Sequence, residues 1–288
     1  MSNDKNIRVF KGATAIITGG ASGIGRGFAE ELAKRGCEVV LADLQIELAE
    51  EVASAINTSG GRARAVKTDV TDFTQVDRLV RECVSLSGRL DYMFNNAGIG
   101  IAGDVRHYGM EDWNYILDVN LRGVINGVQA AYRVMLDQGF GHIINTASVG
   151  GLLPSPGNVA YAATKHGVVG LSTSLRAEAA RTGVRVSVLC PGFVRTAIFD
   201  GGGKYGRILM DMTPELQRRL LEMVEKLKPM SPNTLAQKAL RSIQKNKALI
   251  IVPLWWKVFW CLFCLFPSPV ISLTSKTFLS TQKKLGIK

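Results

Sequence analysis

The chain has 288 residues, of which 47% are hydrophobic and 20% are charged, so its composition is that of a globular protein and not of a disordered one. The formal net charge is +11, yet Glu225 is the last acidic residue, and residues 226–288 carry eleven Lys and Arg. The remaining bases number 35 − 11 = 24 and balance the 24 acids, so residues 1–225 are neutral. Because the net positive charge is confined to residues 226–288, a nucleic-acid site would have to lie there alone, and we expect no nucleic-acid partner.

Targeting and cysteine signals are weak. The start of the chain, Met1–Phe10, is polar and lacks the apolar run of a secretory signal. The five cysteines are scattered and odd in number, which argues against a disulfide framework and favours a reducing, cytoplasmic location. Cys261 and Cys264 form a CxxC pair, but no second pair or nearby histidine completes a zinc site, so we expect no metal.

Short apolar runs alternate with longer amphipathic segments through most of the chain. A helical pattern follows the first run, and helical stretches separate the later ones. The runs predicted to be strands are Ala13–Thr18, Glu38–Asp43, Ala63–Thr68, Leu90–Asn95, His142–Thr146, Arg185–Leu189 and Ala248–Val252. Buried strands that alternate with helices are typical of a parallel sheet covered on both faces. The sequence thus predicts a single α/β domain over residues 1–253, with a doubly wound, Rossmann-type sheet of about seven strands and helices on both faces.

Residues 195–230 differ from this pattern. They contain four glycines, Gly201, Gly202, Gly203 and Gly206, followed by a charged stretch with helical spacing at residues 214–228. Glycines that flank a short amphipathic element suit a mobile lid over a site. A plain surface insertion explains the composition equally well, and both interpretations stay open.

A glycine-rich turn, TGGASGIG at residues 18–25, joins the first strand to the first helix. Glycines there let backbone N–H groups approach a pyrophosphate, and the positive end of the helix dipole adds to the attraction. Asp43 ends the second strand, where a carboxylate can accept both hydroxyls of an adenosine ribose and would repel a 2′-phosphate. Because Leu44, Gln45 and Ile46 follow without a base, the pattern favours NAD over NADP. Asp43 could instead be a solvated cap of the next helix.

The spacing TGxxxGxG resembles that of the short-chain dehydrogenase/reductase family, and further motifs of that family follow in order over residues 10–255. They are Asn95–Gly98 (NNAG), Asn120, Ser148, the YxxxK pair Tyr161 and Lys165, Pro191–Gly192 and Thr196. Any one of them could arise by chance, but six in the right order and context could hardly do so together. The resemblance implies a hydride-transferring oxidoreductase (EC 1.1.1.-) that assembles as a homodimer or homotetramer.

The resemblance also implies roles for individual residues. Tyr161 would be the general acid/base, Ser148 would bind the substrate oxygen, Lys165 would hold the nicotinamide ribose, and Asn120 would hold a proton-relaying water. Tyr161 and Ser148 would thereby contact the substrate. The residues expected to bind the cofactor are Gly19, Ser22, Gly23, Ile24, Gly25, Asp43, Asp69, Val70, Asn96, Ala97, Gly98, Tyr161, Lys165, Pro191, Gly192, Val194 and Thr196.

The residue types of the YxxxK pair fit proton transfer for a physical reason. Oxidation of an alcohol needs a base whose pKa is not far from the working pH, whereas tyrosine normally titrates near 10. Lys165 lies one helical turn after Tyr161. A cation about 4 Å from the phenolate contributes roughly 4 kcal/mol at an effective dielectric near 20, enough to lower the pKa by about 3. We therefore expect a lowered Tyr161 pKa.

The C-terminal extension, residues 254–288, is aromatic and basic. The run Leu254–Phe266 would be about 20 Å long as a helix, too short for a hydrocarbon core about 30 Å thick. Its tryptophans and flanking bases suit a segment that lies on an anionic membrane surface. Burial in an oligomer interface, or a place in the wall of the substrate pocket, is the competing interpretation.

These observations lead to one main functional prediction. The chain is expected to transfer a hydride between NAD(H) and a secondary alcohol or ketone, with a steroid, retinoid or long-chain alcohol as the substrate class. One alternative is a non-catalytic, membrane-associated NAD sensor or scaffold, against which the intact Ser148, Tyr161 and Lys165 speak. Another is a nucleotide-sugar epimerase or dehydratase, which usually carries a TGxxGxxG loop and a larger C-terminal substrate domain.

Overall fold

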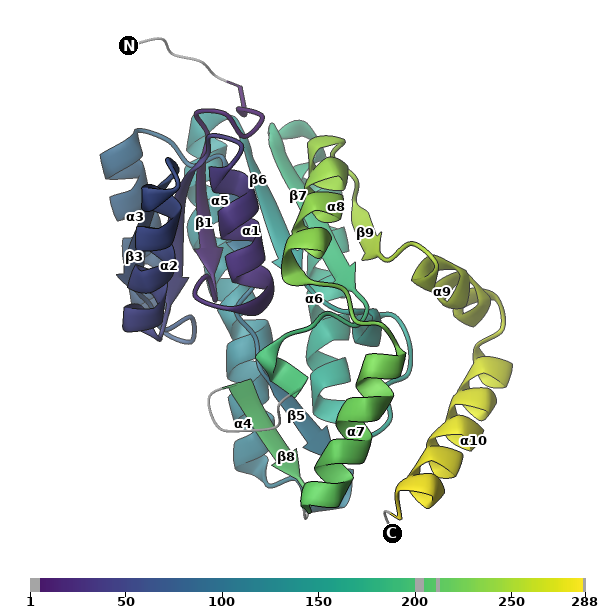
Figure 1. The fold of residues 1–288 in the computed structure, drawn as a ribbon. Coiled ribbons are helices and arrows are strands. Elements are labelled where there is room, and N and C mark those ends of the chain that lie inside the picture. Colours follow the sequence, from purple (N-terminus) through teal and green to yellow (C-terminus); the bar gives the residue numbers. More distant parts are fainter. Residues whose placement is uncertain (1–5, 200–204, 211–212, 287–288) are drawn as a thin grey trace.

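A seven-stranded parallel sheet forms the centre of the computed structural model, which describes residues 6–199, 205–210 and 213–286 (Figure 1). The strand order is β3-β2-β1-β4-β6-β7-β9. The strands are β1 (Thr14–Thr18), β2 (Glu38–Asp43), β3 (Arg62–Lys67), β4 (Tyr92–Asn95), β6 (Gly141–Thr146), β7 (Val184–Pro191) and β9 (Leu249–Val252). Every neighbouring pair in this sheet is parallel. The predicted single-domain, doubly wound α/β fold is therefore confirmed.

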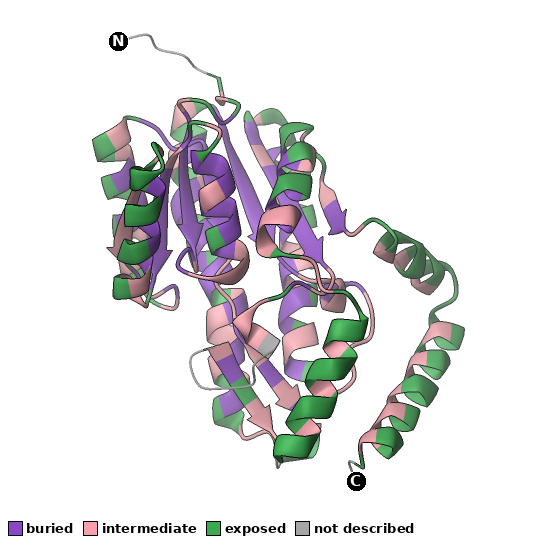
Figure 2. Ribbon diagram, in the orientation of Figure 1, coloured by how far each residue is buried: buried purple, intermediate pink, exposed green. Residues whose placement is uncertain are grey.

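Helices cover both faces of the sheet and bury an apolar layer against each (Figure 2). One face carries α1 (Gly23–Ala33), α2 (Ile46–Thr58) and α8 (Pro232–Gln244). The other carries α3 (Phe73–Ser87), α5 (Gly123–Gln138) and α6 (Val159–Glu178). Because the inner strands are buried on both faces, strands such as β1 (TAIIT) and β2 (EVVLAD) appear in the sequence as nearly continuous apolar runs.

The chain order places a topological switch between β1 and β4. From β1 the chain moves outward through β2 to β3, then returns to β4 on the other side of β1 and continues through β6 to β9. The connecting loops therefore diverge at the carboxyl ends of β1 and β4, where open α/β sheets bind their ligands.

A small second sheet, which the sequence pattern did not predict, lies beyond that edge. Strands β5 (Gly100–Gly103) and β8 (Gly206–Leu209) pair in parallel, near helices α4 (Met110–Leu117) and α7 (Pro214–Lys226) (Figure 1). Both strands have only four residues, too few to produce a recognisable hydrophobic period. Helix α7 confirms the expected helical stretch, whereas glycines 201–203 lie outside the described residues.

Two helices follow the last strand. Helices α9 (Trp256–Leu265) and α10 (Pro267–Leu285) form an elbow beside the domain, and their outer surfaces are exposed (Figures 1 and 2). Among the described residues, no helix has the length and hydropathy needed to cross a membrane. This result agrees with the sequence argument that the aromatic run is too short to span one.

Candidate active site

The glycine-rich turn is packed so tightly that side chains could not replace its glycines. Gly19 has φ +63°, and a Cβ there would lie 2.9 Å from the Cα of Ala97. A Cβ on Gly25 would collide with the carbonyl oxygen of Gly19 and lie 2.7 Å from Asn96 Nδ2. Ser22 is the N-cap of α1, but its side chain makes no capping hydrogen bond. The first N–H groups of the helix are therefore available to an anion at the positive end of its dipole.

Thr18 ties this turn to the NNAG segment. Its Oγ1 donates to the Phe94 carbonyl (3.3 Å) and accepts from the backbone N–H groups of Asn96 (2.9 Å) and Ala97 (3.1 Å). Asn96 Nδ2 donates in return to the Thr18 carbonyl (3.1 Å). These bonds fix the ends of β1 and β4 to each other at the switch point. Thr18 was missing from the predicted site residues, although it is the first letter of the TGxxxGxG motif.

Two carboxylates mark the far end of the same edge. Asp43, which is 8% exposed, accepts from the N–H groups of Ala21 (3.0 Å) and Gln45 (3.0 Å). It therefore bridges the glycine turn and the start of α2, whose N-cap is Gln45. Asp69 follows β3, and its Oδ1 accepts from the N–H (2.9 Å) and Oγ1 (2.7 Å) of Thr71. Each carboxylate is held in place and still has an oxygen lone pair free for a ligand.

The YxxxK pair projects from α6 toward the end of β6. Lys165 is 3% exposed, and its Nζ donates to the Thr146 carbonyl (3.0 Å) and lies 5.5 Å from the centroid of the Tyr161 ring. Ser148 follows β6, accepts from the Gly150 N–H (3.1 Å) and forms a hydrogen bond with Tyr161. The structure therefore brings Ser148, Tyr161 and Lys165 together, as predicted.

Asn120 lies behind this trio, in a π-helical turn (Asp118–Arg122) between α4 and α5. It is fully buried; its Oδ1 accepts from the Ile99 N–H (2.8 Å), and its Nδ2 donates to the Ile99 carbonyl (2.9 Å) and to Thr164 Oγ1 (3.4 Å). A Cβ on Gly98 would lie 3.3 Å from Asn120 Oδ1 and 3.4 Å from Lys165 Nζ. Asn120 and Lys165 thus approach each other around the backbone of Gly98. Single-turn π-helices of this kind occur often at functional sites.

Burial dominates the protonation equilibria of the YxxxK pair. It raises the pKa of Tyr161 above its ordinary value, and the hydrogen bond to Ser148 offsets only part of that rise. Burial also lowers the pKa of Lys165 to about 8. The expectation that Lys165 lowers the pKa of Tyr161 is therefore wrong. The ammonium group binds the Thr146 carbonyl and lies over the tyrosine ring, so desolvation outweighs its attraction for the phenolate.

A cavity of about 1010 Å³ unites these groups. It is lined by all the residues predicted to bind cofactor except Gly25, which packs beneath the turn, and it also reaches Ser148. Asn120 does not line it. Beyond Tyr161 the lining includes Ala102 and Ile208 from the second sheet and Leu220 and Val224 from α7. Apolar Ile99 and Val119 and polar Asp118, Arg207 and Gln217 also line the cavity.

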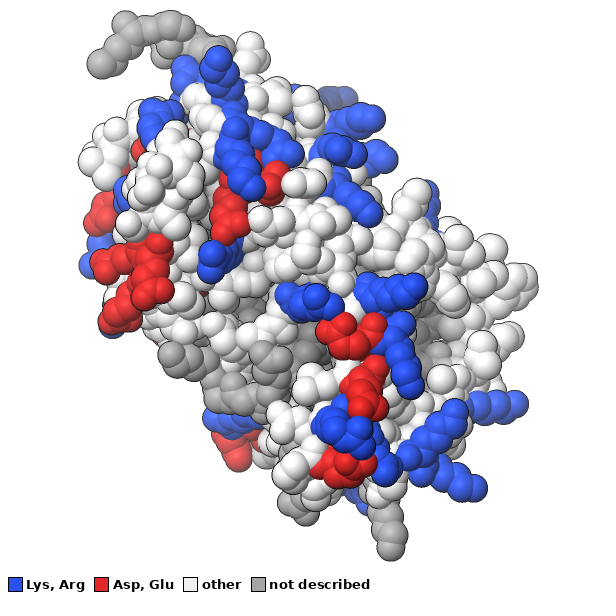
Figure 3. Space-filling view, in the orientation of Figure 1, with Lys and Arg blue, Asp and Glu red and all other residues white. Residues whose placement is uncertain are grey.

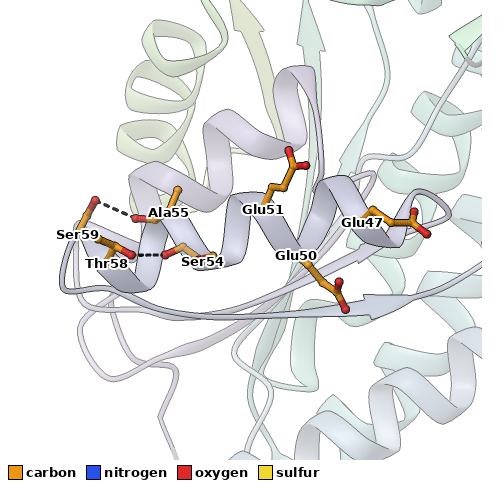
Figure 4. A pocket seen from close by; sticks show the side chains of 7 residues that line it. All are labelled: Glu47, Glu50, Glu51, Ser54, Ala55, Thr58 and Ser59. Carbon is orange, nitrogen blue, oxygen red and sulfur yellow. Dashed lines mark hydrogen bonds between the residues drawn. The ribbon is translucent and has the colours of Figure 1, made fainter.

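A second hollow, on the outer face of α2, has a different character. It is lined by Glu47, Glu50, Glu51, Ser54, Ala55, Thr58 and Ser59, all from one helix (Figure 4). Thr58 and Ser59 donate to backbone carbonyls of their own helix, and the glutamates point outward in different directions (Figure 4). This hollow is the solvated face of a helix, and we assign it no chemistry.

The fold and the site together define an α/β oxidoreductase with a dinucleotide-type binding edge. A family model described as short chain dehydrogenase matches residues 13–203, which is two thirds of the chain. The chain belongs to the short-chain dehydrogenases, as the resemblance in its motifs indicated.

Similar proteins support this assignment. The oxidoreductase UcpA of Salmonella typhimurium is 39% identical over 190 residues, which cover 66% of this chain and 72% of that protein. UcpA of Escherichia coli is 35% identical over 220 residues, covering 76% and 81%. A short-chain dehydrogenase/reductase from Burkholderia phymatum, solved in complex with NAD, superposes with a TM-score of 0.81 and 32% identity over 88% of this chain and 94% of that one. Levodione reductase superposes with a TM-score of 0.76 and 29% identity, covering 84% and 96%.

Proposed function

We propose that this protein is an NAD(H)-dependent dehydrogenase or reductase that interconverts a hydrophobic secondary alcohol and its ketone. One observation carries the proposal. Ser148, Tyr161 and Lys165 converge in a cavity that continues on one side to the glycine turn and on the other to the second sheet and α7, where Ala102, Ile208, Leu220 and Val224 contribute apolar side chains. A binding-only sensor would have no use for a buried proton-transfer group in such a cavity.

The residues divide the chemistry between them. When bound, NAD would supply the acceptor for the hydride that leaves the carbinol carbon. Tyr161 removes the hydroxyl proton, and Ser148 donates a hydrogen bond to the same substrate oxygen. Lys165 holds the nicotinamide ribose and, once its charge lies beside the developing phenolate, favours proton removal. The water that would carry the proton to solvent is proposed to lie near Asn120, whose side chain is bonded to the Ile99 peptide group behind Lys165.

The proposed preference for NAD depends on Asp43. Its buried carboxylate lines the cavity at the end of β2, and Leu44 and Gln45 beside it offer no positive charge. A ribose can donate hydroxyl hydrogens to this carboxylate, whereas a 2′-phosphate would be repelled. We expect Asp43→Asn to narrow the preference for NAD over NADP about fivefold, because removing one like-charge contact is worth on the order of 1 kcal/mol. Asp69→Asn, which removes a charge at the neighbouring strand, is the matched control.

The substrate is proposed to belong to the steroid, retinoid or long-chain alcohol class, because apolar side chains contribute to the cavity wall beyond Tyr161. Leu220 and Val224 bring the inner face of α7 into this wall, which supports the interpretation of residues 195–230 as a lid. The proposal also includes a homodimer or homotetramer and a cytoplasmic location. In this proposal the catalytic domain spans residues 1–253, and residues 254–288 form a C-terminal extension.

The experiment is a turnover assay with NAD and with NADP across steroid, retinoid, long-chain aliphatic and small polar alcohols. We expect NAD reduction with at least one hydrophobic alcohol and loss of this activity in Tyr161→Phe. Tyr132→Phe is the matched control, because this partly buried tyrosine of α5 does not line the cavity. Turnover of small polar alcohols alone would overturn the substrate class. NAD binding without any turnover would instead favour the sensor.

A further inference from the structure

Helix α9 exposes an apolar face that the domain does not cover. Trp255, Val258, Phe259, Leu262 and Leu265 recur at helical spacing, and each is between 45% and 70% exposed. Together with Leu254, which is 70% exposed, we call them the tail surface. Soluble monomers rarely leave so many large apolar side chains contiguous and in water, so a face of this kind marks a contact site.

The inner side of the tail packs against loops of the active site. The indole of Trp256 occupies the space where Gly192 would carry a Cβ, and its ring lies 6.0 Å from that of Phe193. On α10, Phe278 lies 3.4 Å from the position of a Cβ on Gly157. Gly192 and Phe193 line the cavity, as do Ser155 and Asn158 on either side of Gly157. The tail is therefore attached to both the coenzyme side and the substrate side of the cavity.

Charge identifies the kind of partner. Residues 254–288 contain Lys257, Lys276, Lys283, Lys284 and Lys288 and no acidic residue. Figure 3 shows a largely uncharged surface over α9 and basic side chains toward the C-terminal end of α10. Helix α7 offers a contrast, because its charges are paired within the helix, as in the ion pairs of Arg218 with Glu215 and Glu222. An apolar face bordered by unbalanced lysines complements an anionic lipid surface.

Two other occupants fit less well. A ten-residue helix is about 15 Å long, half the thickness of a hydrocarbon core, so α9 can enter the interfacial region but not cross it. In a symmetric dimer formed through the tail surface, the lysines of two copies would face each other without any acidic residue of the tail to pair with them. An anionic bilayer satisfies both the apolar face and the charge.

We infer that the tail surface docks on an anionic lipid bilayer and brings the active-site cavity beside the lipid, so that a membrane-dissolved alcohol or ketone enters from the bilayer. The docking stands on the tail alone, whereas the entry route rests on the proposed function. Trp255 and Phe259 reach the level of the headgroups, and the lysines contact anionic phosphates.

The docking is tested by co-sedimentation of the full chain with vesicles of phosphatidylglycerol and phosphatidylcholine in equal parts. We expect binding that weakens with salt and falls at least about tenfold in the double variant Phe259→Ser, Leu262→Ser, because each lost apolar side chain and each lysine contributes on the order of a few-fold. The matched control is Leu86→Ser, which removes a leucine 72% exposed on α3. A third variant, Lys276→Gln with Lys283→Gln and Lys284→Gln, separates charge from apolar contact and leaves the core unchanged.

Each outcome decides the question. Equal binding by wild type and double variant, or equal binding to pure phosphatidylcholine vesicles, would overturn the docking. Loss of a dimer in the double variant, seen by light scattering without any vesicle binding by wild type, would assign the surface to a second copy instead. If the protein binds vesicles but oxidises no alcohol, the docking stands and the proposed function fails. If it does oxidise one, vesicles should lower the KM for a hydrophobic alcohol in wild type but not in the double variant.

Discussion

The carboxyl edge of the sheet and the C-terminal tail violate the usual distribution of residues in opposite ways. At the sheet edge, polar side chains such as Asn120, Asp43 and Lys165 are buried, and each has hydrogen-bond partners. In the tail, large apolar side chains are in water. Burying a polar group costs free energy unless it is paired, and exposing a large apolar face costs free energy unless a partner covers it. The first exception positions groups inside the protein, whereas the second prepares a contact outside it.

The largest effect expected from this comparison follows removal of a buried charge at the site. Lys165→Met should lower turnover by about 10³-fold, because it removes the cation that favours the phenolate and the group proposed to hold the ribose. NAD binding, measured by titration calorimetry, should weaken as well. Lys257→Met, which removes a lysine from the exposed face of α9, should leave turnover of a water-dispersed substrate unchanged. An active Lys165→Met protein would contradict the assigned roles.

A smaller effect is expected in the pH dependence of stability, because a histidine is buried in the core. Burial lowers the pKa of His142 to about 3. Its Nε2 lies 2.8 Å from Ser187 Oγ, whose proton is donated to the Lys247 carbonyl, so the neutral imidazole is the donor in the His142–Ser187 bond. The pKa of His142 in the folded state lies below the unfolded value near 6.5. The stability that the buried, neutral His142 contributes is therefore fully present above pH 6.5 and is lost as pH falls toward 3.

Between pH 7 and pH 4, His142 should therefore account for about 3 kcal/mol of lost stability. Urea unfolding at several pH values measures this loss. In His142→Gln the free energy of unfolding should fall less steeply with pH below pH 6.5 (the acid limb of the curve), although this variant is less stable than wild type at pH 7. His107→Gln, at an exposed position, is the control. An acid limb with the same slope in wild type and His142→Gln would contradict this account.

The smallest effect is expected in the tail. Phe259→Ser should change the free energy of unfolding by less than about 0.5 kcal/mol, because the side chain is 51% exposed and lies outside the core. Trp256→Ser should cost considerably more, because this ring fills the space at Gly192. Thermal unfolding of the two variants measures the difference. Equal losses would mean that the outer face of α9 is packed after all, and the contrast between tail and core would fail.

The sheet could be predicted because buried parallel strands leave local signals in the sequence. The trio at its edge, Ser148, Tyr161 and Lys165, was predicted only through the ordered motifs that resemble those of the short-chain dehydrogenase/reductase family. The β5–β8 pair could not be predicted, because four-residue strands such as Gly100–Gly103 carry no periodicity and their partners are distant in the chain. The hydrogen-bonding roles of Thr18 and Thr164 could not be predicted, because the partners of a threonine hydroxyl are set by the folded structure and leave no pattern in the sequence.

The prediction that the pKa of Tyr161 is lowered was wrong for a related reason. Sequence spacing gives the separation of Tyr161 and Lys165 along a helix, but it gives neither the depth of burial nor the competing bond from Lys165 to the Thr146 carbonyl. Desolvation is a property of the whole fold. The pKa of Tyr161 is therefore decided by its depth of burial and by the partner that Lys165 binds, both of which arise only on folding.

The central claim, that the trio at the sheet edge performs hydride transfer, is tested most directly by following an isotopic label. The protein is incubated with NAD and an alcohol deuterated at the carbinol carbon, and the nicotinamide product is examined by mass spectrometry. The account predicts that deuterium appears in the reduced coenzyme with wild type and is absent with Tyr161→Phe, although both bind NAD. Coenzyme binding without label transfer from any alcohol that wild type binds, or equal transfer by Tyr161→Phe, would contradict it.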